Sequence, residues 1–251
     1  MDHKNINKIV YFASDFHLGI PSFEDSLKRE RKLVAWLSMA SKDATDVFLL
    51  GDLFDFWFEY KYTIPKGFTR FLGKIAELSD SGINIYVFTG NHDMWMFDYL
   101  ENELGVKIIR QPTDFTFNNK TFHIAHGDGL GPGDHFYKLI KKIFSNKLCQ
   151  WLFARIHPNL GIRIANFWSK KSRAKENQTP SFLGEEKEWL IQYSKDILQK
   201  KHYNYFIYGH RHLPIEHNLE NDSTYINLGD WIEYYTYAKF EGDQLSLISF
   251  K

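Results

Sequence analysis

Five apolar runs in this sequence are each followed by a cluster of residues that can bind metals or transfer protons. The runs read IVYFAS, DVFLL, INIYVF, TFHIA and YFIY, the length of short buried β-strands. In open α/β sheets the carboxyl ends of strands gather at one edge, where ligands bind. We therefore expect the clusters to converge. They contain Asp15 and His17; Asp52 and Asp55; Asn91, His92 and Asp93; His126; and His210 and His212.

Each cluster also has a structural explanation when it is taken alone. Asp15 could cap a turn, Asp52 could accept backbone hydrogen bonds, and a lone histidine is more often a polar side chain than a ligand. Gly90 and Asn91 are typical of a turn. Together, however, the five clusters favour a metal site, because burying so many ionisable groups at one place is costly without cations.

The types of donor atom fit two divalent cations. Carboxylate, imidazole and amide oxygen without thiolate suit Mn²⁺, Fe²⁺ or Zn²⁺. The candidate ligands outnumber those of a typical catalytic zinc site, and a carboxylate such as Asp52 can bridge two ions. Two such cations, two ligand carboxylates and a bridging hydroxide leave net positive charge, which attracts a phosphoryl group. The predicted ligands are Asp15, His17, Asp52, Asn91, His126, His210 and His212.

The elements that must position these residues alternate between strand and helix patterns in the first half of the chain, as in an α/β fold. Strands are expected at residues 8–14, 46–50, 83–88 and 121–125, and helices at residues 22–39 and 68–78. The strand sequences are apolar almost throughout, which indicates burial on both faces. Residues 203–210, 223–230, 232–240 and 244–250, rich in Tyr, Phe, Ile and Thr, predict further strands, some of them antiparallel.

Composition narrows the class of protein. The 251 residues suit one large domain or two small ones, and 43% hydrophobic residues are enough for a sizeable core. A formal net charge of zero gives no sign of a nucleic-acid partner, and none is expected. The single cysteine, Cys149, excludes an intramolecular disulfide and fits a reducing compartment. Apolar runs are too short for a signal peptide or a membrane span, so we expect a cytoplasmic protein.

In their order and spacing, the motifs D-x-H, G-D-x-x-D, G-N-H-D, H-G-D and G-H-x-H resemble those of the calcineurin-like metallophosphoesterase superfamily, over residues 15–212. The resemblance implies a β-sandwich flanked by helices and two divalent ions, with Mn²⁺ favoured. It also implies that His92, paired with Asp93, contacts substrate phosphate and can protonate the leaving group. The implied ligand sets are Asp15, His17, Asp52 and His212 for one ion, and Asp52, Asn91, His126 and His210 for the other.

A basic and apolar segment separates the fourth cluster from the fifth. Residues 138–175 contain ten Lys or Arg and no Asp or Glu, interleaved with large apolar residues. An ordinary helical lid with a solvated basic face would have the same composition. A cap that receives acyl chains and phosphates at a membrane surface would also have it. We expect a single core domain at residues 1–133 and 178–251 and an inserted helical cap at residues 134–177.

The stretches SDFHLG, GDLFDFW, HGDGLGPGDHFYKLI and RIANFWSKKSRAKEN resemble one branch of the superfamily, the UDP-2,3-diacylglucosamine pyrophosphatases of lipid A biosynthesis. That resemblance covers nearly the whole chain. It implies that a metal-bound hydroxide splits UDP-2,3-diacylglucosamine into UMP and 2,3-diacylglucosamine 1-phosphate at the inner face of the cytoplasmic membrane. Many members of the branch have Arg where this chain has His92. The substrate contacts implied by position are Asp134, Tyr137, Arg163, Ser172 and Arg173.

Two other functions remain open at this point. One is another dinuclear phosphoesterase, such as a phosphatase or a nucleotide phosphodiesterase. The other is a non-enzymatic lipid-binding scaffold on the same fold. Retention of every candidate ligand argues against the scaffold, and metal-dependent turnover separates the two classes.

Overall fold

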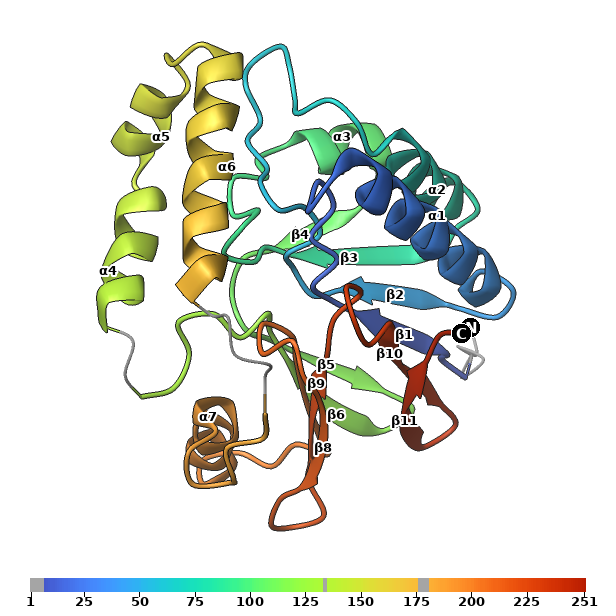
Figure 1. Ribbon diagram of the computed structural model, residues 1–251. Helices are drawn as coiled ribbons and strands as arrows, with labels where there is room; N and C mark the ends of the chain where they lie inside the picture. The colour runs from blue at the N-terminus through green and yellow to red at the C-terminus, as the bar shows by residue number, and fades with distance from the viewer. Residues whose placement is uncertain (1–6, 133–134, 176–180) are drawn as a thin grey trace.

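The computed structural model describes residues 7–132, 135–175 and 181–251. Two mixed β-sheets pack against each other, and helices cover their outer faces (Figure 1). Further helices lie beyond one edge of the sandwich. The fold is therefore the expected α/β arrangement, a β-sandwich flanked by helices.

The first sheet has six strands, in the order β11-β10-β1-β2-β3-β4. Strands β1 to β4 run parallel to one another, and β10 and β11 add an antiparallel hairpin beside β1. The strands are β1 (Val10–Ala13), β2 (Asp46–Leu49), β3 (Asn84–Phe88), β4 (Lys107–Ile109), β10 (Thr236–Glu241) and β11 (Gln244–Ser249).

The second sheet has five strands, in the order β5-β6-β7-β9-β8. Its three middle strands are parallel, and its two outer strands are antiparallel to their neighbours. The strands are β5 (Thr113–Phe117), β6 (Lys120–Ile124), β7 (Tyr205–Tyr208), β8 (Pro214–Asn218) and β9 (Thr224–Leu228). Fully buried aromatic and aliphatic residues of both sheets, among them Phe12, Phe48 and Phe122, fill the space between them.

Helices bury their apolar faces on the outer sides of the sandwich. The outer face of the first sheet is covered by α1 (Phe23–Ala40), α2 (Thr69–Asp80) and α3 (Tyr99–Leu104) (Figure 1). The Ser22 side chain accepts a hydrogen bond from the Asp25 backbone N–H and so caps the start of α1. The second sheet is covered by α7 (Trp189–Leu198), which buries Leu190 and Ile191 against it. Both faces of each sheet are therefore shielded, as the apolar strand sequences require.

Three helices lie beyond the carboxyl ends of the parallel strands: α4 (His135–Phe144), α5 (Lys147–Phe153) and α6 (Pro158–Lys175) (Figure 1). We call them the three-helix segment. Aromatic packing attaches this segment to the core, since the rings of Phe58 and Phe153 have centroids 4.8 Å apart. Trp95 also donates its indole N–H to the carbonyl oxygen of Phe144 at 2.8 Å. An ion pair between the partly exposed Lys141 and the buried Asp128, 2.6 Å apart, ties α4 to the loop after β6.

The predicted elements are confirmed, but others were missed. The four expected strands of the first half are β1, β2, β3 and β6, and the two expected helices are α1 and α2. Strands β4, β5 and β8 and helices α3 and α7 were not predicted, although alternate residues Phe115 and Phe117 in β5 show the pattern of a half-buried strand. Within the described part of the chain, no helix combines the length and apolarity needed to cross a bilayer.

Candidate metal centre

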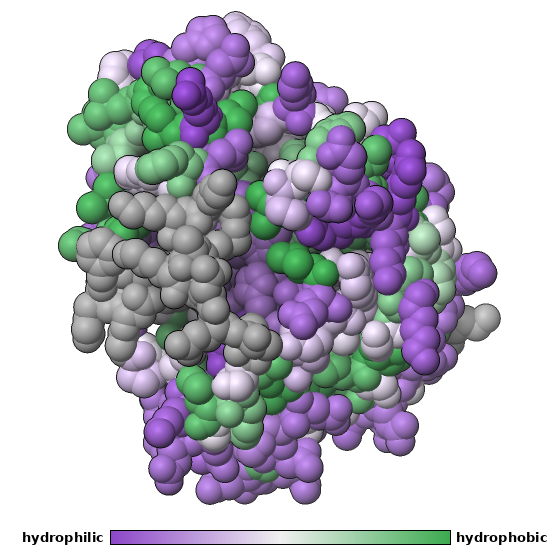
Figure 2. Space-filling view, viewed as in Figure 1, coloured by the Kyte–Doolittle hydropathy of each residue, from purple (hydrophilic) through white to green (hydrophobic). Residues whose placement is uncertain are grey.

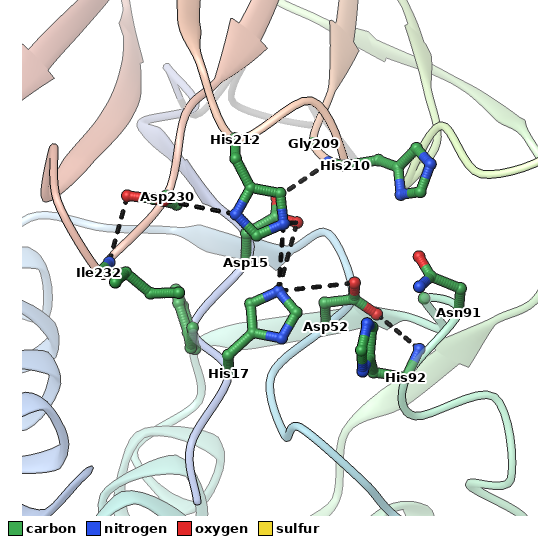
Figure 3. Close-up of polar contacts among 12 residues, drawn as sticks. Asp15, His17, Asp52, Asn91, His92, Gly209, His210, His212, Asp230 and Ile232 are labelled. Atoms are coloured by element: carbon green, nitrogen blue, oxygen red, sulfur yellow. Dashed lines mark hydrogen bonds and ion pairs between the residues drawn. The ribbon is translucent and has the colours of Figure 1, made fainter. Parts of the chain in front are cut away.

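All the predicted ligands lie in loops that directly follow parallel strands (Figure 3). β1, β2 and β3 are neighbours in the first sheet, and β6 and β7 are neighbours in the second, so five strand ends meet at one edge of the sandwich. The loops contribute Asp15 and His17 after β1, Asp52 after β2, Asn91 after β3, His126 after β6, and His210 and His212 after β7. Convergence of these loops is thereby confirmed.

Several of these residues have a positive φ, a backbone conformation that is unfavourable for any residue with a Cβ atom. A positive φ costs a non-glycine residue about 1–3 kcal/mol and persists where surrounding contacts fix it. Here the left-handed conformation turns successive side chains toward one point at the end of a strand. The residues are Asp15 (φ 56°), His17 (φ 44°), Asp52 (φ 52°), His210 (φ 67°) and His212 (φ 53°).

A buried arginine fixes the first of these loops. The Arg29 guanidinium of α1 donates to the backbone carbonyl oxygens of Phe16, His17 and Ile20, at 3.1, 2.8 and 3.2 Å. The backbone N–H of His17 also donates to the carbonyl of Asp52 at 2.9 Å, which joins the first ligand loop to the second. The positions of His17 and Asp52 are therefore set by the same backbone network.

Asp93 fixes the second and third loops. Its buried carboxylate accepts hydrogen bonds from the backbone N–H groups of Leu53 at 2.7 Å and Gly90 at 2.8 Å, and longer ones from Asp52 and Phe54. Both oxygens are occupied by these donors. The expected pairing of Asp93 with His92 is not among the contacts of the described residues, and Asp93 instead holds the backbone that presents Asp52.

Two glycines let the loops approach closely. A Cβ atom at Gly90 would collide with the Asp52 carboxylate, and one at Gly209 would lie 2.5 Å from Asp15 Oδ2. These are the glycines of the G-N-H-D and G-H-x-H motifs, so the motif requires glycine where a neighbouring ligand passes over the backbone.

The first group of donor atoms contains Asp15, His17, Asp52 and His212. Figure 3 shows the imidazole rings of His17 and His212 facing each other beside Asp15, and their Nε2 atoms are 3.3 Å apart. His212 Nε2 lies 3.4 Å from Asp15 Oδ1, and His17 Nε2 lies 3.7 Å from Asp52 Oδ2. Nδ1 of His212 contacts the carboxylate of Asp230 at 3.3 Å, which orients the ring.

The second group contains Asp52, His126 and His210, with Asn91 beside them. His126 Nδ1 donates to the carbonyl oxygen of Leu50 at 2.6 Å, which leaves Nε2 to accept or to bind a cation. That Nε2 lies 3.4 Å from Asp52 Oδ2 and 3.2 Å from Asn91 Oδ1. Asp52 is the residue common to both groups, as a bridging carboxylate would be.

These distances suit metal coordination. Two donors about 2.0–2.2 Å from one ion, at angles of about 90–110°, are roughly 2.8–3.6 Å apart, close to the separations found here. Asp15 Oδ1 is buried and has no hydrogen-bond partner among the described residues. An ionised oxygen in that position is costly unless a cation lies near it. The donor set therefore fits two divalent ions that share Asp52.

The pKa values of the histidines in these two groups also show the influence of the nearby carboxylates. Burial alone would lower the pKa of His126, but the carboxylates around it, Asp52 foremost, together outweigh burial and raise the pKa to about 10. Burial also opposes protonation of His212, yet the carboxylates of Asp15, Asp230 and Asp52 together raise its pKa to about 9. The carboxylates thus create a negative potential strong enough to retain protons on two of the four imidazoles, whereas burial lowers the pKa of His17 and lowers that of His210 to about 4. Divalent cations would satisfy the same potential and displace those protons.

His92 lies beside this centre and contacts the three-helix segment. Its Nδ1 is 3.0 Å from the carbonyl oxygen of Asp55, 3.7 Å from the Asp55 carboxylate and 3.2 Å from the hydroxyl of Ser169. Ser169, on α6, in turn donates to Asp55 Oδ2 at 2.9 Å. The backbone N–H of His92 donates to Asp52 Oδ1 at 2.8 Å (Figure 3). Asp55 and Ser169 therefore orient this ring.

The predicted substrate contacts are not tested by the described residues and stay predictions. Asp134 lies outside the described residues. Tyr137 belongs to α4 and Ser172 and Arg173 belong to α6, while Arg163 is exposed on α6. Sequence reasoning missed Arg29, Ser169 and Asp230 as residues that orient the ligands. Asp55 belonged to the G-D-x-x-D motif, so its position could have suggested a role.

Comparison with known proteins agrees with this geometry. Residues 9–214 match the family described as calcineurin-like phosphoesterase, and the chain belongs to that family. It is also 39% identical to a UDP-2,3-diacylglucosamine hydrolase of Porphyromonas gingivalis, over 96% of this chain and 97% of that protein. Proteins of the same name from Actinobacillus succinogenes and Vibrio vulnificus are 27% and 28% identical, over 89% and 94% of this chain and 92% and 95% of theirs.

Proposed function

We propose that this chain is a metal-dependent hydrolase that splits the pyrophosphate bond of UDP-2,3-diacylglucosamine, in lipid A biosynthesis. The products are UMP and 2,3-diacylglucosamine 1-phosphate. Relatives with this name align over nearly the whole chain. The structural observation that carries the proposal is a cluster of buried carboxylate and imidazole donors directly beside an apolar, basic three-helix segment. A phosphate site next to a lipid-binding surface suits a substrate that has both parts.

The centre would hold two divalent ions, and Mn²⁺ is the ion we favour. When bound, these ions supply positive charge for the phosphoryl oxygens and activate a water molecule for attack. The chain's contribution is to fix the donors, through Arg29, Asp93 and the left-handed loops, before substrate arrives. Asp15, His17, Asp52 and His212 would hold one ion, and Asp52, Asn91, His126 and His210 would hold the other.

His92 transfers a proton and contacts the substrate phosphate. Its Nδ1 faces the Asp55 carbonyl, which holds a proton on that nitrogen and leaves Nε2 for the substrate. The Asp55 carboxylate lies 3.7 Å from Nδ1 and helps to orient the ring so that Nε2 is the nitrogen left for proton transfer. The reaction forms a bond from the water oxygen, whose proton passes to solvent, to the uridine-side phosphorus. It breaks the bond to the lipid phosphate, whose departing oxygen takes the proton.

The three-helix segment forms the cap for the acyl chains, with the boundaries 134–177 expected from the sequence. Large apolar side chains remain exposed on it, among them Leu148, Trp151, Phe167 and Trp168. Figure 2 shows apolar surface over this segment, at the upper left, beside a hydrophilic hollow. The positions predicted to contact substrate are Asp134, Tyr137, Arg163, Ser172 and Arg173.

The same surface would bring the protein to a membrane. Exposed cations such as Lys142, Lys147 and Arg163 alternate with the apolar residues, which suits anionic lipid headgroups. We place the protein at the inner face of the cytoplasmic membrane, where it would associate peripherally.

The test is mass spectrometry of the products formed from UDP-2,3-diacylglucosamine with Mn²⁺. We expect UMP and 2,3-diacylglucosamine 1-phosphate, loss of turnover in chelator, and recovery when Mn²⁺ is restored. In ¹⁸O-labelled water the label should enter UMP and leave the lipid phosphate unlabelled. Formation of UDP and a dephosphorylated sugar would reject the pyrophosphatase assignment. Turnover of small phosphates alone would indicate another phosphoesterase, and no metal-dependent turnover would indicate a scaffold.

A further inference from the structure

A pocket opens beside the metal centre on the side of α7. Its volume is about 430 Å³, within the range of roughly 300–1,000 Å³ typical of small-molecule sites. One wall is the loop after β6, with Gly129, Leu130 and Pro132, and the other is the start of α7. His210, one of the candidate metal ligands, forms part of the lining. A ligand in the pocket would therefore lie next to a phosphate bound at the second group of donors.

Trp189 offers an aromatic surface in this pocket. The Arg211 guanidinium lies over the indole, 5.5 Å from the ring centroid, and also forms an ion pair with the buried Glu188 at 3.1 Å. The ring is thus supported on one side by a charged group that is itself fixed. Gly131 packs so closely on the Trp189 backbone that an added Cβ would lie 2.6 Å from its carbonyl oxygen. Arg211 and Gly131 therefore constrain the position of Trp189.

Polar groups accompany the indole. Gln192 and Lys187 line the pocket, and Gln192 Nε2 donates to the carbonyl oxygen of Glu185 at 2.9 Å. That bond leaves the amide oxygen of Gln192 as an acceptor. An aromatic ring with a nearby amide acceptor suits a planar heterocycle that carries an N–H group.

The pocket and the three-helix segment lie on different sides of the metal centre. His92 contacts the three-helix segment through Ser169 of α6, whereas His210 faces the pocket. In Figure 1 the strand ends lie between α6 and α7. The exposed apolar side chains are concentrated on the side of α6. A substrate with a lipid at one end and a nucleoside at the other therefore has a distinct surface for each end.

We infer that the α7 pocket binds the uridine of the substrate, with the uracil stacked on Trp189. This inference rests on the proposed function. It also sets the direction in which the substrate lies, since the uridine-side phosphorus comes next to the donors around His210. The lipid phosphate then points toward His92, the group that supplies its proton.

The test is calorimetric titration of UMP into the Mn²⁺-loaded full chain and its variants. Trp189→Ala should weaken UMP binding by roughly 5- to 150-fold, the equivalent of about 1–3 kcal/mol for one base stacked on an aromatic ring. Trp189→Phe keeps an aromatic face and should retain most of the affinity. Phe23→Ala removes an aromatic side chain that is 73% exposed at the start of α1, and it should leave the UMP affinity unchanged.

Circular dichroism and metal analysis of each variant would confirm that it is folded and loaded. If the wild-type chain hydrolyses the lipid substrate but Trp189→Ala binds UMP as tightly as wild type does, this inference is overturned and the proposed function stands. A wild-type chain that neither hydrolyses the lipid substrate nor binds UMP would reject both. Equal loss of affinity in Trp189→Phe and Trp189→Ala would also count against stacking.

Discussion

Replacing Asp93 by Asn tests whether this residue holds the ligand loops or acts on His92. Its two carboxylate oxygens accept short hydrogen bonds from the backbone N–H groups of Leu53 and Gly90. An amide has only one acceptor oxygen, so its NH₂ group must face one of these donors. One hydrogen bond to a charged acceptor, worth about 1.5–3 kcal/mol, is lost, and one buried donor is left without a partner at a further cost of about 1–3 kcal/mol.

We therefore expect Asp93→Asn to destabilise the fold by at least about 3 kcal/mol. For a chain of this size that corresponds to a fall of roughly 6–12 °C in Tm. The affinity for Mn²⁺ should fall by about 10- to 100-fold, the usual effect of losing a group that orients a ligand. If Asp93 acts only through the loops, saturating Mn²⁺ should restore most of kcat.

Thermal melts, calorimetric Mn²⁺ titrations and kcat at saturating metal provide the measurements. Asp98→Asn is a matched control, because Asp98 is exposed and caps no helix through its side chain. It should leave all three quantities unchanged. The reasoning is refuted if Asp93→Asn keeps the stability and metal affinity of the wild type but loses kcat at saturating Mn²⁺. That result would support the pairing of Asp93 with His92 expected from the sequence.

Four further predictions concern the centre, the surface and the fold. Asp52→Ala should reduce the bound metal from two ions to one or none in elemental analysis, since it removes the shared carboxylate; two retained ions would contradict the bridge. His92→Ala should lower kcat by roughly 10²–10⁴ with metal content intact, and unchanged kcat would leave the ring without a chemical role. The double variant Lys142→Glu/Arg163→Glu should bind anionic vesicles more weakly, and wild-type binding should fall as salt rises; no wild-type binding at low salt would argue against membrane association. Burial lowers the pKa of His123 below its usual 6.5, so the unfolded chain binds more protons and the free energy of unfolding should fall as pH drops through 6.5. His123→Gln should make the free energy of unfolding, measured by urea titration, depend less on pH in that range. The same pH dependence in the variant and the wild type would reject this role of His123.

The convergence of the candidate metal ligands could be predicted from the sequence, because each of these residues closely follows an apolar run. A short strand fixes the direction of the next two or three residues, so Asp15 and Asp52 needed only parallel neighbouring strands to meet. The same reasoning predicts that His126 and His210 lie close together, because they follow neighbouring parallel strands of the second sheet. Local sequence was therefore sufficient wherever a strand end and a ligand are adjacent.

Contacts between distant segments could not be predicted in this way. Ser169 meets His92 only because a helix 77 residues further along the chain packs over the strand ends. Asp93 follows His92 directly, so a pairing of these two side chains was plausible. The left-handed loop around Asp52, however, brings competing backbone N–H donors to the carboxylate of Asp93. Trp189 belongs to a helix that was not predicted, so the sequence motifs gave no indication of the pocket that it lines.

The left-handed loops that present the ligands also affect which metal the protein holds. Hydrogen bonds from Arg29 and to Asp93 fix these loops without any contribution from an ion. The donors that they present, carboxylate, imidazole and amide oxygen, suit several divalent cations, whose intrinsic affinities follow the general order for divalent metals. Which cation occupies the enzyme would consequently be decided by the cell's metal supply, so the organism's homeostasis of manganese, iron and zinc would regulate the centre.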